Sequence, residues 1–283
     1  MAIELKGAPV AAAINERAQK ELCALNELAI MPTLAIVRVG EREDDLAYEN
    51  GAVKRCEKVG VAVKRVTLPE NIAQDVLINN IIELNGDSSV HGILILMPLP
   101  KQFDGEAVRR ALAPEKDVDG ITDGSLAGVF TGSGEGFAPC TAQACIEILD
   151  HYGIDCKGKR AVVIGRSLVV GKPVSMMLLK KNATVTICHT RTVDMPSVTK
   201  NAEILIAAAG KAKTIGAEYL SKNQTVIDVG INFLDGAMCG DVDYGAALPI
   251  VSAITPVPGG VGTVTTSVLV SHVVEAARRQ SKR

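Results

Sequence analysis

The 283-residue sequence lacks the features that mark a protein as a partner of nucleic acid or of a membrane. Its formal net charge is only −2, because 30 basic and 32 acidic residues are scattered along the chain. This pattern predicts no contact with nucleic acid or an anionic bilayer. No apolar run approaches the roughly 18 residues that a membrane helix needs, and the charged N-terminal segment does not resemble a signal peptide. We therefore expect a small-molecule partner, with no nucleic acid and no membrane.

Cysteine motifs are missing as well. The seven cysteines are an odd number, and no two of them stand as Cys-x-x-Cys. This set argues against a disulfide framework and against a structural zinc site. With 47% hydrophobic and 22% charged residues, the chain can still bury one large or two modest cores. We expect a folded protein without a metal, in a reducing, cytoplasmic setting.

Seven short runs rich in β-branched residues alternate with segments of helical periodicity. The runs cover residues 33–40, 61–68, 91–99, 160–165, 183–189, 203–210 and 225–232. Alternation of this kind predicts parallel sheets with helices on both faces, so the expected fold class is α/β. Residues 114–141 interrupt the alternation with a stretch rich in Gly, Asp, Ser and Thr, and we predict a domain boundary there. The last segment, residues 263–283, has apolar residues at helical spacing and a basic end, which predicts a terminal helix.

The stretch RAVVIGRSLVVGKPVSMMLLKK, from Arg160, has the pattern of a nucleotide-binding turn. A buried strand leads into a turn at Gly165, and a helix follows from about Gly171. Glycines in such a turn let the backbone approach a pyrophosphate, and the helix N-terminus offers free N–H groups. The spacing is Gly-x-Ser-x-x-x-Gly rather than Gly-x-Gly-x-x-Gly, so a strand-to-helix turn without a ligand is the alternative interpretation.

The second strand of this region favours NADP over NAD. NAD sites usually carry Asp or Glu roughly 20 residues after the glycines, whereas here TICHTRT places Thr190 and Arg191 at that point. Together with Arg166, these side chains offer two guanidinium groups and a hydroxyl, which suit a 2′-phosphate. Each arginine alone could also be a solvated surface charge.

Six segments together resemble the bifunctional methylenetetrahydrofolate dehydrogenase/cyclohydrolase family. In chain order they are GILILMPLP, PEKDVDG, PCT, VVIGRSLVVGKP, DVGIN and ITPVPGGVG, and the resemblance extends from about Ile36 to the terminal helix. It implies two α/β domains with a cleft between them. The expected folate-binding catalytic domain comprises residues 1–138 plus 263–283, and a Rossmann-like NADP-binding domain comprises residues 139–262. The resemblance also implies NADP as cofactor, tetrahydrofolate derivatives as substrates, a cytoplasmic homodimer, and a role in one-carbon metabolism and purine biosynthesis.

The resemblance assigns roles to residues of this sequence. Tyr48 and Asp119 are expected to be catalytic and to lie near the pterin of the substrate. The other substrate-binding residues implied are Leu96, Pro98, Pro258, Gly259 and Gly260, and the cofactor-binding residues implied are Gly165, Arg166, Ser167, Thr190 and Ile231. Arg191 is added to the cofactor-binding residues from the charge pattern described above. From the residues alone, Tyr48 could be an ordinary half-buried aromatic, and Asp119 could stabilise its own turn. Cys140 lacks a flanking histidine that would support a role as nucleophile.

The sequence departs from the family pattern where a catalytic lysine is expected. In the family motif Tyr-x-x-x-Lys, Ala52 stands at the lysine position, and Leu96 stands where the family usually has glutamine. Asp45 likewise replaces a serine, and the family GGVGPMT reads GGVGTVT from Gly259. On a helix Tyr48 and Ala52 share a face, whereas Lys54 lies roughly 200° around from Ala52.

The two reactions of the family depend on these positions differently. Hydride transfer needs the alignment of two rings but no ionisable side chain, whereas hydrolytic ring opening needs a positioned acid or base, typically worth about 10²–10⁴-fold. We therefore predict NADP-dependent oxidation of 5,10-methylenetetrahydrofolate to 5,10-methenyltetrahydrofolate, with weak or absent cyclohydrolase activity. The main alternative is a bifunctional enzyme that also gives 10-formyltetrahydrofolate, with Lys54 or Asp45 in proton transfer. A silent NADP- or folate-binding protein and a different dehydrogenase with the same nucleotide domain are further alternatives.

Overall fold

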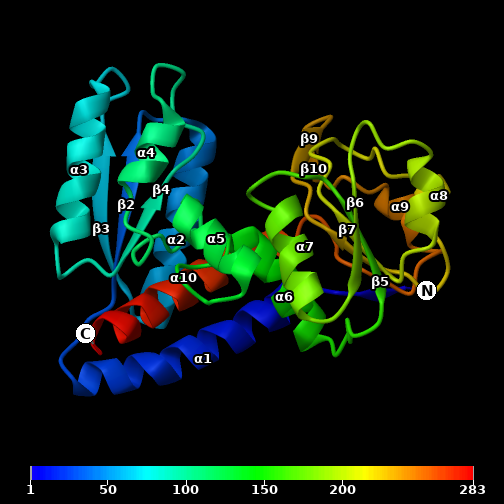
Figure 1. Cartoon of the computed structure of the whole chain (residues 1–283), viewed down its shortest axis with the longest axis horizontal. Coiled ribbons are helices and arrows are strands. Elements are labelled where there is room, and N and C mark those ends of the chain that lie inside the picture. Colours follow the sequence, from blue (N-terminus) through cyan, green and yellow to red (C-terminus); the bar gives the residue numbers. More distant parts are fainter. Residues whose placement is uncertain (1, 283) are drawn as a thin grey trace. The chain divides into compact units, whose positions relative to one another are not determined.

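The computed structural model describes residues 2–282 and confirms the α/β class (Figure 1). The chain forms two compact units. One combines the first twelve residues with Thr141–Thr265, and the other combines Ala13–Cys140 with the residues from Thr266 onward. The expected functional division, 1–138 plus 263–283 against 139–262, stays a prediction.

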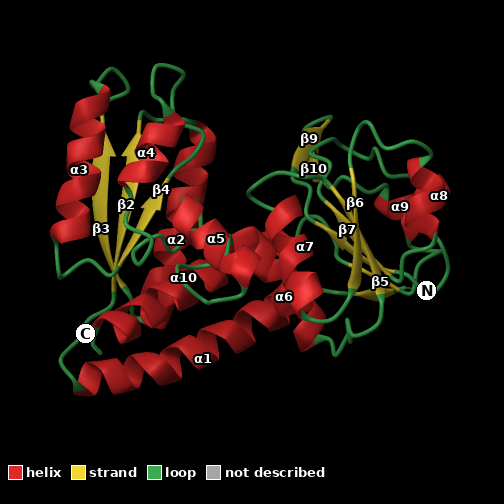
Figure 2. Ribbon diagram, viewed as in Figure 1, coloured by secondary structure: helices red, strands yellow, loops and turns green. Residues whose placement is uncertain are grey.

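The unit that contains Ala13–Cys140 has a three-stranded parallel sheet of order β3-β2-β4. The strands are β2 (Thr33–Val39), β3 (Ala62–Leu68) and β4 (Gly92–Ile95). The central strand β2 is buried along nearly its whole length, as expected for a parallel strand covered on both faces. Figure 2 shows helices on both sides of this sheet, and they are α2 (Glu43–Val59), α3 (Gln74–Gly86) and α4 (Gly105–Ala111).

Helix α2 begins and ends where its sequence favours it. Its first turn carries three acidic residues, which interact favourably with the helix dipole. The helix ends at Gly60, which adopts φ +100° and donates its N–H to the carbonyl of Cys56. These limits place Tyr48 inside the helix, one turn before Ala52.

The other unit contains a six-stranded sheet in which all paired neighbours are parallel, in the order β1-β11-β8-β7-β5-β6. Its strands are β1 (Ile3–Glu4), β5 (Arg160–Ile164), β6 (Thr184–Cys188), β7 (Ile204–Ala207), β8 (Thr225–Asp228) and β11 (Ala253–Ile254). The strand order reverses next to β5, which has β6 on one side and β7 on the other. In open α/β sheets, ligands bind at the carboxyl ends of strands beside such a reversal.

All seven strands predicted from the sequence are present, and the structure adds shorter elements. Strands β1 and β11 have two residues each, and β9 (Asn232–Leu234) and β10 (Ala237–Cys239) form an antiparallel hairpin. Helix α5 (Asp123–Thr131) lies inside the segment expected to be irregular, and the hydroxyl of Thr122 caps it by accepting from the N–H of Ser125.

The remaining helices of the six-stranded unit connect its strands. They are α6 (Cys140–His151), α7 (Gly171–Lys180), α8 (Met195–Lys200), the 3₁₀ turn Ala217–Tyr219 and α9 (Tyr244–Ala247).

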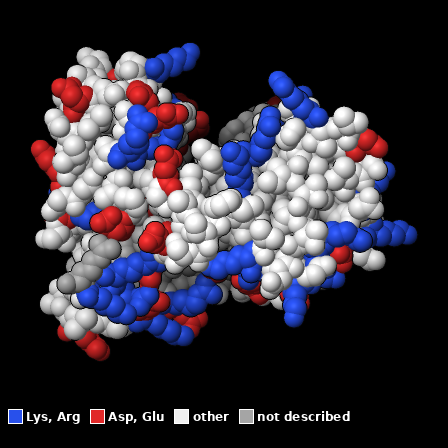
Figure 3. Space-filling view, viewed as in Figure 1, with Lys and Arg blue, Asp and Glu red and all other residues white. Residues whose placement is uncertain are grey.

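Two long helices lie near the ends of the chain. They are α1 (Gly7–Glu27) and the predicted terminal helix, α10 (Val261–Gln280). None of the helices within residues 2–282 is both long and apolar enough to cross a bilayer. Figure 3 shows Lys and Arg mixed with Asp and Glu over the face in view.

Candidate active site

Helix α2 separates Ala52 from Lys54 as the helical spacing predicts. Ala52 is 0% exposed, and Lys54 is exposed on the outer side of the helix. Tyr48 is partly buried one turn before Ala52. The side that carries Tyr48 and Ala52 therefore faces the interior of its unit, and the amine of Lys54 does not.

The structure places Asp119 near enough to Tyr48 for its charge to influence the tyrosine hydroxyl, although 71 positions separate them in the sequence. Burial raises the pKa of the Tyr48 hydroxyl well above its usual range, and the negative charge of Asp119 raises it further. Both residues belong to the unit of the three-stranded sheet. Two of the expected folate-binding residues are thus neighbours within one compact unit.

Asp119 lies in a tight turn that the buried side chain of Asp117 stabilises. The carboxylate of Asp117, 0% exposed, accepts the N–H groups of Ile121 at 3.0 Å and Thr122 at 2.8 Å. Gly120 has φ +70°, and a Cβ there would lie 2.4 Å from the nitrogen of Pro139. Glycine is therefore required at this position, and the turn presents Asp119 in a defined direction.

The ionisation of Asp119 is shifted towards neutrality. Burial raises its pKa to about 7, a hydrogen bond with Cys140 acts in the opposite direction, and the charge of Asp117 raises it. A carboxyl group with this pKa can accept a hydrogen bond when ionised or donate one when protonated. It is the most strongly shifted carboxyl group near the expected pterin site.

Cys140 has a histidine neighbour that the sequence did not reveal. His272 of α10 places Nδ1 3.7 Å from the sulfur, and the thiol also lies 3.2 Å from the carbonyl oxygen of Val118. Because 132 positions separate Cys140 from His272, sequence proximity gave no signal. Burial, followed by the charge of Asp119, raises the pKa of the thiol well above its usual range, so Cys140 stays protonated and is a poor nucleophile.

Leu96 and Pro98 follow β4 on the same unit. Leu96 is 5% exposed, and its N–H donates to the carbonyl of Val37 at 3.0 Å, which extends the pairing with β2. The carbonyl oxygen of Pro98 accepts from the guanidinium of Arg42 at 2.8 Å. Leu96 therefore offers an apolar, buried side chain where the family usually has a polar amide.

Asp45, the other residue considered for proton transfer, is also buried at 6% exposure. It lies 3.4 Å from the guanidinium of Arg42 and one turn before Tyr48. Burial raises the pKa of its carboxyl group, while the charge of Arg42 lowers it. Asp45 thus has an environment in which it can hold a proton more readily than a solvated aspartate.

The nucleotide-binding turn has the close backbone packing that the glycines predict. Gly165 follows β5 with φ +126°, and a Cβ there would lie 2.3 Å from the carbonyl oxygen of Ala208. A Cβ on Gly171, the first residue of α7, would lie 2.2 Å from the carbonyl oxygen of Gly165. Only glycine fits at these two positions, because the backbone after β5 packs directly against Ala208 and against the first residue of α7.

The polar residues predicted to bind NADP follow two adjacent strands. Arg166 and Ser167 come after β5, and Thr190 and Arg191 come after β6, which pairs with β5 in parallel. All four are exposed, and the hydroxyl of Ser167 accepts from the N–H of Val170 at 3.1 Å. The carboxyl ends of neighbouring parallel strands meet at one sheet edge, so these residues gather where a dinucleotide binds in such folds.

Pro258, Gly259 and Gly260 line a cavity of about 220 Å³ together with Ile231. The remaining lining residues come from the same loop, the first turn of α10, the end of β8 with the residues after it, and Met238. Ile231 is 60% exposed, and the N–H of Gly7 donates to the carbonyl of Gly259 at 2.8 Å. The structure thus groups predicted substrate-binding residues with one predicted cofactor-binding residue.

Two buried aspartates, Asp228 and Asp241, hold the loops beside this cavity. Asp228 accepts three backbone N–H groups, from Gly230, Asp241 and Val242, each at 3.0 Å. Burial nevertheless raises its pKa to about 6, because these hydrogen bonds only partly offset desolvation. Among the residues that the structure describes, no group of three His, Cys, Asp or Glu side chains could hold a metal ion.

Two family models match the chain and together span most of its length. The model described as tetrahydrofolate dehydrogenase/cyclohydrolase, catalytic domain, matches residues 5–119. The model described as tetrahydrofolate dehydrogenase/cyclohydrolase, NAD(P)-binding domain, matches residues 139–281.

Individual relatives and solved structures agree with these matches. The bifunctional protein FolD 1 of Desulfitobacterium hafniense is 50% identical over 277 residues, which are 98% of this chain and 99% of that protein. The crystal structure of the bifunctional FolD enzyme of Campylobacter jejuni has a TM-score of 0.96 at 36% identity and covers 99% of both chains. The Trypanosoma brucei enzyme, solved with NADP and an inhibitor, has a TM-score of 0.93 at 31% identity, with 100% of this chain and 99% of that chain covered.

Proposed function

This chain belongs to the tetrahydrofolate dehydrogenase/cyclohydrolase family, and we propose that it oxidises 5,10-methylenetetrahydrofolate to 5,10-methenyltetrahydrofolate with NADP⁺, with weak or absent cyclohydrolase activity. The observation that carries the second part is the buried Ala52 at the lysine position of the family motif, with Lys54 exposed. Leu96, buried where the family usually has glutamine, supports the same conclusion.

The nucleotide turn fits a dinucleotide phosphate group. Gly165 and Gly171 allow the tight backbone turn that leads into the N-terminus of α7, where free N–H groups can meet a pyrophosphate, and Arg166 and Arg191 supply the positive charge that a 2′-phosphate needs. The related Trypanosoma brucei enzyme was solved with NADP, which supports the same cofactor here.

Hydride transfer requires alignment more than acid–base chemistry. When bound, the nicotinamide ring accepts a hydride from the methylene carbon of the folate, and the lone pairs of the two flanking nitrogens stabilise the resulting cation. In our proposal Tyr48 packs against the pterin, while the carboxylate of Asp119 accepts a hydrogen bond from it. Neither side chain has to transfer a proton during this step.

The hydrolytic step requires proton transfers that the side chains of Ala52 and Leu96 cannot perform. Water must attack the methenyl carbon and lose a proton, and a ring nitrogen must gain one as the ring opens. The methyl group of Ala52 and the isobutyl group of Leu96 can neither donate nor accept a proton. Their burial also offers no polar group that could orient a water molecule.

A hydrolysis assay tests this proposal. Purified protein should show NADP⁺-dependent oxidation of methylenetetrahydrofolate but should not accelerate loss of the methenyl compound above the spontaneous rate. The double variant Ala52→Lys/Leu96→Gln should gain enzyme-dependent hydrolysis, because it restores an amine and an amide partner. Robust hydrolysis by the unmodified protein would refute the loss of cyclohydrolase activity, and no gain in a folded double variant would count against the positional assignment.

The second candidate function is the full bifunctional reaction, which yields 10-formyltetrahydrofolate. The buried Asp45, in the first turn of α2 and with a raised pKa, favours it, and relatives at about 50% identity are named bifunctional proteins. If Asp45 transfers the proton, Asp45→Asn should abolish hydrolysis and spare hydride transfer. Lys54→Ala provides the matched test for the exposed lysine. Hydrolysis that survives both substitutions would exclude both residues.

The assembly and cellular location belong to the same proposal. We expect a cytoplasmic homodimer, as the family resemblance implies. Sedimentation of the purified chain across a range of concentrations tests the dimer, since a monomer at all concentrations would contradict it.

A further inference from the structure

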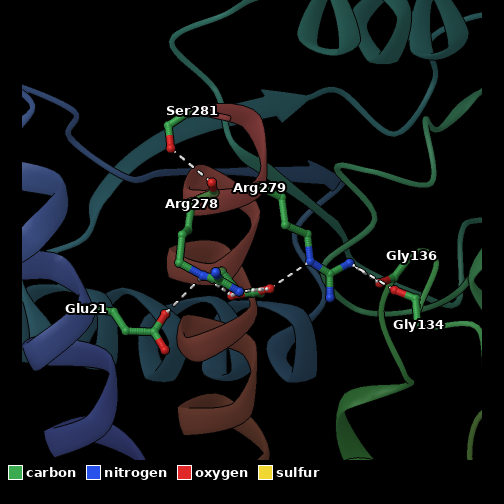
Figure 4. Close-up of polar contacts among 7 residues, drawn as sticks. Glu21, Gly134, Gly136, Arg278, Arg279 and Ser281 are labelled. Carbon is green, nitrogen blue, oxygen red and sulfur yellow. Dashed lines mark hydrogen bonds and ion pairs between the residues drawn. The ribbon is translucent and has the colours of Figure 1, made fainter. Parts of the chain in front are cut away.

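The terminal helix α10 directs one face towards the loop that precedes Cys140. Glu275 and Arg279 follow His272 by three and seven positions, so the three residues lie along one side of the helix. Figure 4 shows Arg279 reaching the backbone of Gly134 and Gly136, whose carbonyl oxygens accept from it at 3.2 Å and 2.9 Å. Glu275 fixes this arginine at 2.8 Å. Helix α10 is thus hydrogen-bonded to the loop before Cys140 through the Arg279 guanidinium group, which Glu275 keeps in place.

Phe137 lies in the same loop between two side chains of α10. The guanidinium of Arg279 lies 4.5 Å from the centroid of its ring, and the ring of His272 is 5.0 Å away, centroid to centroid. Phe137 is only 5% exposed. These contacts pack the imidazole of His272 against the buried ring of Phe137.

The imidazole makes a hydrogen bond whose direction the chemistry determines. Its Nδ1 lies 2.9 Å from the carbonyl oxygen of Val118. A carbonyl oxygen can only accept, so Nδ1 must carry the proton. The sulfur of Cys140 lies 3.2 Å from the same oxygen, and its single proton can be donated either to this oxygen or to the Asp119 carboxylate.

The carbonyl of Val118 belongs to the peptide group that leads into Asp119. Because the peptide unit is planar, holding this oxygen fixes the plane from which the Cα of Asp119 departs. On the other side of Asp119, the backbone at Gly120 packs directly against residues 137–139. The direction of the Asp119 carboxyl group is thus set between two restrained peptide groups.

We infer that His272 is a positioning residue for Asp119. It acts through the carbonyl of Val118 and not on the substrate itself, and α10 carries it to the turn. The inference rests on the proposed function, in which Asp119 binds the pterin. Its consequence is specific: loss of the Nδ1 donor weakens folate binding and leaves NADP binding unchanged.

Three substitutions separate the hydrogen bond from simple packing. His272→Asn retains an amide N–H close to the place of Nδ1, His272→Gln moves the amide one bond further out, and His272→Leu removes the donor while it keeps an apolar side chain. We expect His272→Leu and His272→Gln to raise the KM for methylenetetrahydrofolate by about three- to tenfold, as expected for a lost hydrogen bond. His272→Asn should keep the KM for methylenetetrahydrofolate close to that of the unmodified enzyme. In all three variants the KM for NADP⁺ should stay within about twofold of the unmodified enzyme.

Calorimetric titration with tetrahydrofolate, without NADP, measures the same effect independently of catalysis. The affinity should fall in the leucine and glutamine variants and recover in the asparagine variant. Equal folate affinity in all three variants would overturn the inference, as would equal losses for asparagine and glutamine, or a parallel loss of NADP affinity. If His272→Leu fails to fold, the asparagine and glutamine pair carries the comparison.

The proposed function fails separately from this inference. An unmodified protein that binds tetrahydrofolate but transfers no hydride refutes the proposed function, while the order of the variants in the titration still decides the role of His272. An unmodified protein that does not bind tetrahydrofolate overturns both.

Discussion

Ala52 and Lys54 stand two positions apart in the sequence and lie on different sides of α2. Their helical phase matters more than their proximity, because the lysine at position 54 projects into solvent whereas position 52, on the buried side, carries only a methyl group. The buried side chains of Ala52 and Leu96 also offer water no hydrogen-bonding partner. Under the proposed function, the methenyl product therefore leaves the enzyme before it is hydrolysed.

Asp119 is the residue whose ionisation is expected to limit both activity and stability. Its pKa is about 7 in the folded protein against an ordinary value of 3.8, so the folded state holds the proton more tightly than the unfolded chain does. The protonated group contributes stability that is complete below about pH 4 and is lost as the pH rises through about 7. We expect Asp119→Asn to have a higher Tm than the unmodified protein at about pH 8, with the difference vanishing near pH 4.

The activity, in contrast to the stability, should increase as the pH rises. The ionised carboxylate is the better acceptor for the pterin, so kcat/KM of the unmodified enzyme should rise with pH through about 7, and Asp119→Asn should be weakly active at every pH. Thermal unfolding and initial rates across the pH range check the two expectations. Glu57→Gln, on the exposed side of α2, serves as the control and should change neither profile. An Asp119→Asn variant less stable than the parent at pH 8 would contradict this account.

At the scale of elements, the connection from β5 to α7 depends on the absence of a side chain at Gly165. Gly165→Ala introduces a Cβ 2.3 Å from the carbonyl of Ala208 and also strains φ +126°. We expect a loss of about 1–3 kcal/mol in the free energy of unfolding, together with weaker NADP binding, measured by urea unfolding and by titration calorimetry. Gly158→Ala is the matched control, since Gly158 has φ +72° but open space around its Cβ position. Equal effects of the two substitutions would show that strain in φ, rather than close packing, explains the glycine.

The sequence predicted those elements whose runs of apolar residues are long enough to show a period. The seven predicted strands have four to seven residues in the structure, and most are runs of buried apolar side chains. Strands β1 and β11 escaped prediction because two residues cannot show a period, and α5 because its glycines and serine resemble a loop. The glycine turn after β5 was predictable because its residues are contiguous. The contact of His272 with Cys140 was not, because it depends on how α10 packs against a loop more than 130 positions earlier in the chain.

At the scale of the whole molecule, the first residues of the chain are integral to the six-stranded sheet. The N–H groups of Ile3 and Leu5 donate to the carbonyls of Ser252 and Ile254, both at 2.8 Å, and Leu5 is 1% exposed. Gly7 then supports the loop of Gly259, which lines the cavity. The N-terminal residues thus brace the loop that follows β11.

Removal of residues 2–5 should therefore destabilise more than the edge of the sheet. We expect the free energy of unfolding to fall by at least about 2 kcal/mol, from the lost burial of Leu5 and the lost backbone hydrogen bonds. Urea unfolding measures this loss, and NADP affinity should fall with it. Ile3→Ser is the control, since the Ile3 side chain is 64% exposed and its substitution should change stability by less than about 0.5 kcal/mol. A truncated chain as stable as the parent would show that β1 is a passive addition.

The chain passes from one compact unit to the other and back, since Ala13–Cys140 is completed by residues from Thr266 onward, beyond the whole of Thr141–Thr265. A ribosome therefore cannot release a finished first unit while it makes the second. His272 and Arg279, which grip the Asp119 turn and its neighbouring loop, emerge after both sheets have been synthesised. This protein therefore cannot follow the usual order of folding during synthesis, in which an N-terminal domain folds first. The turn of Asp119 is completed last.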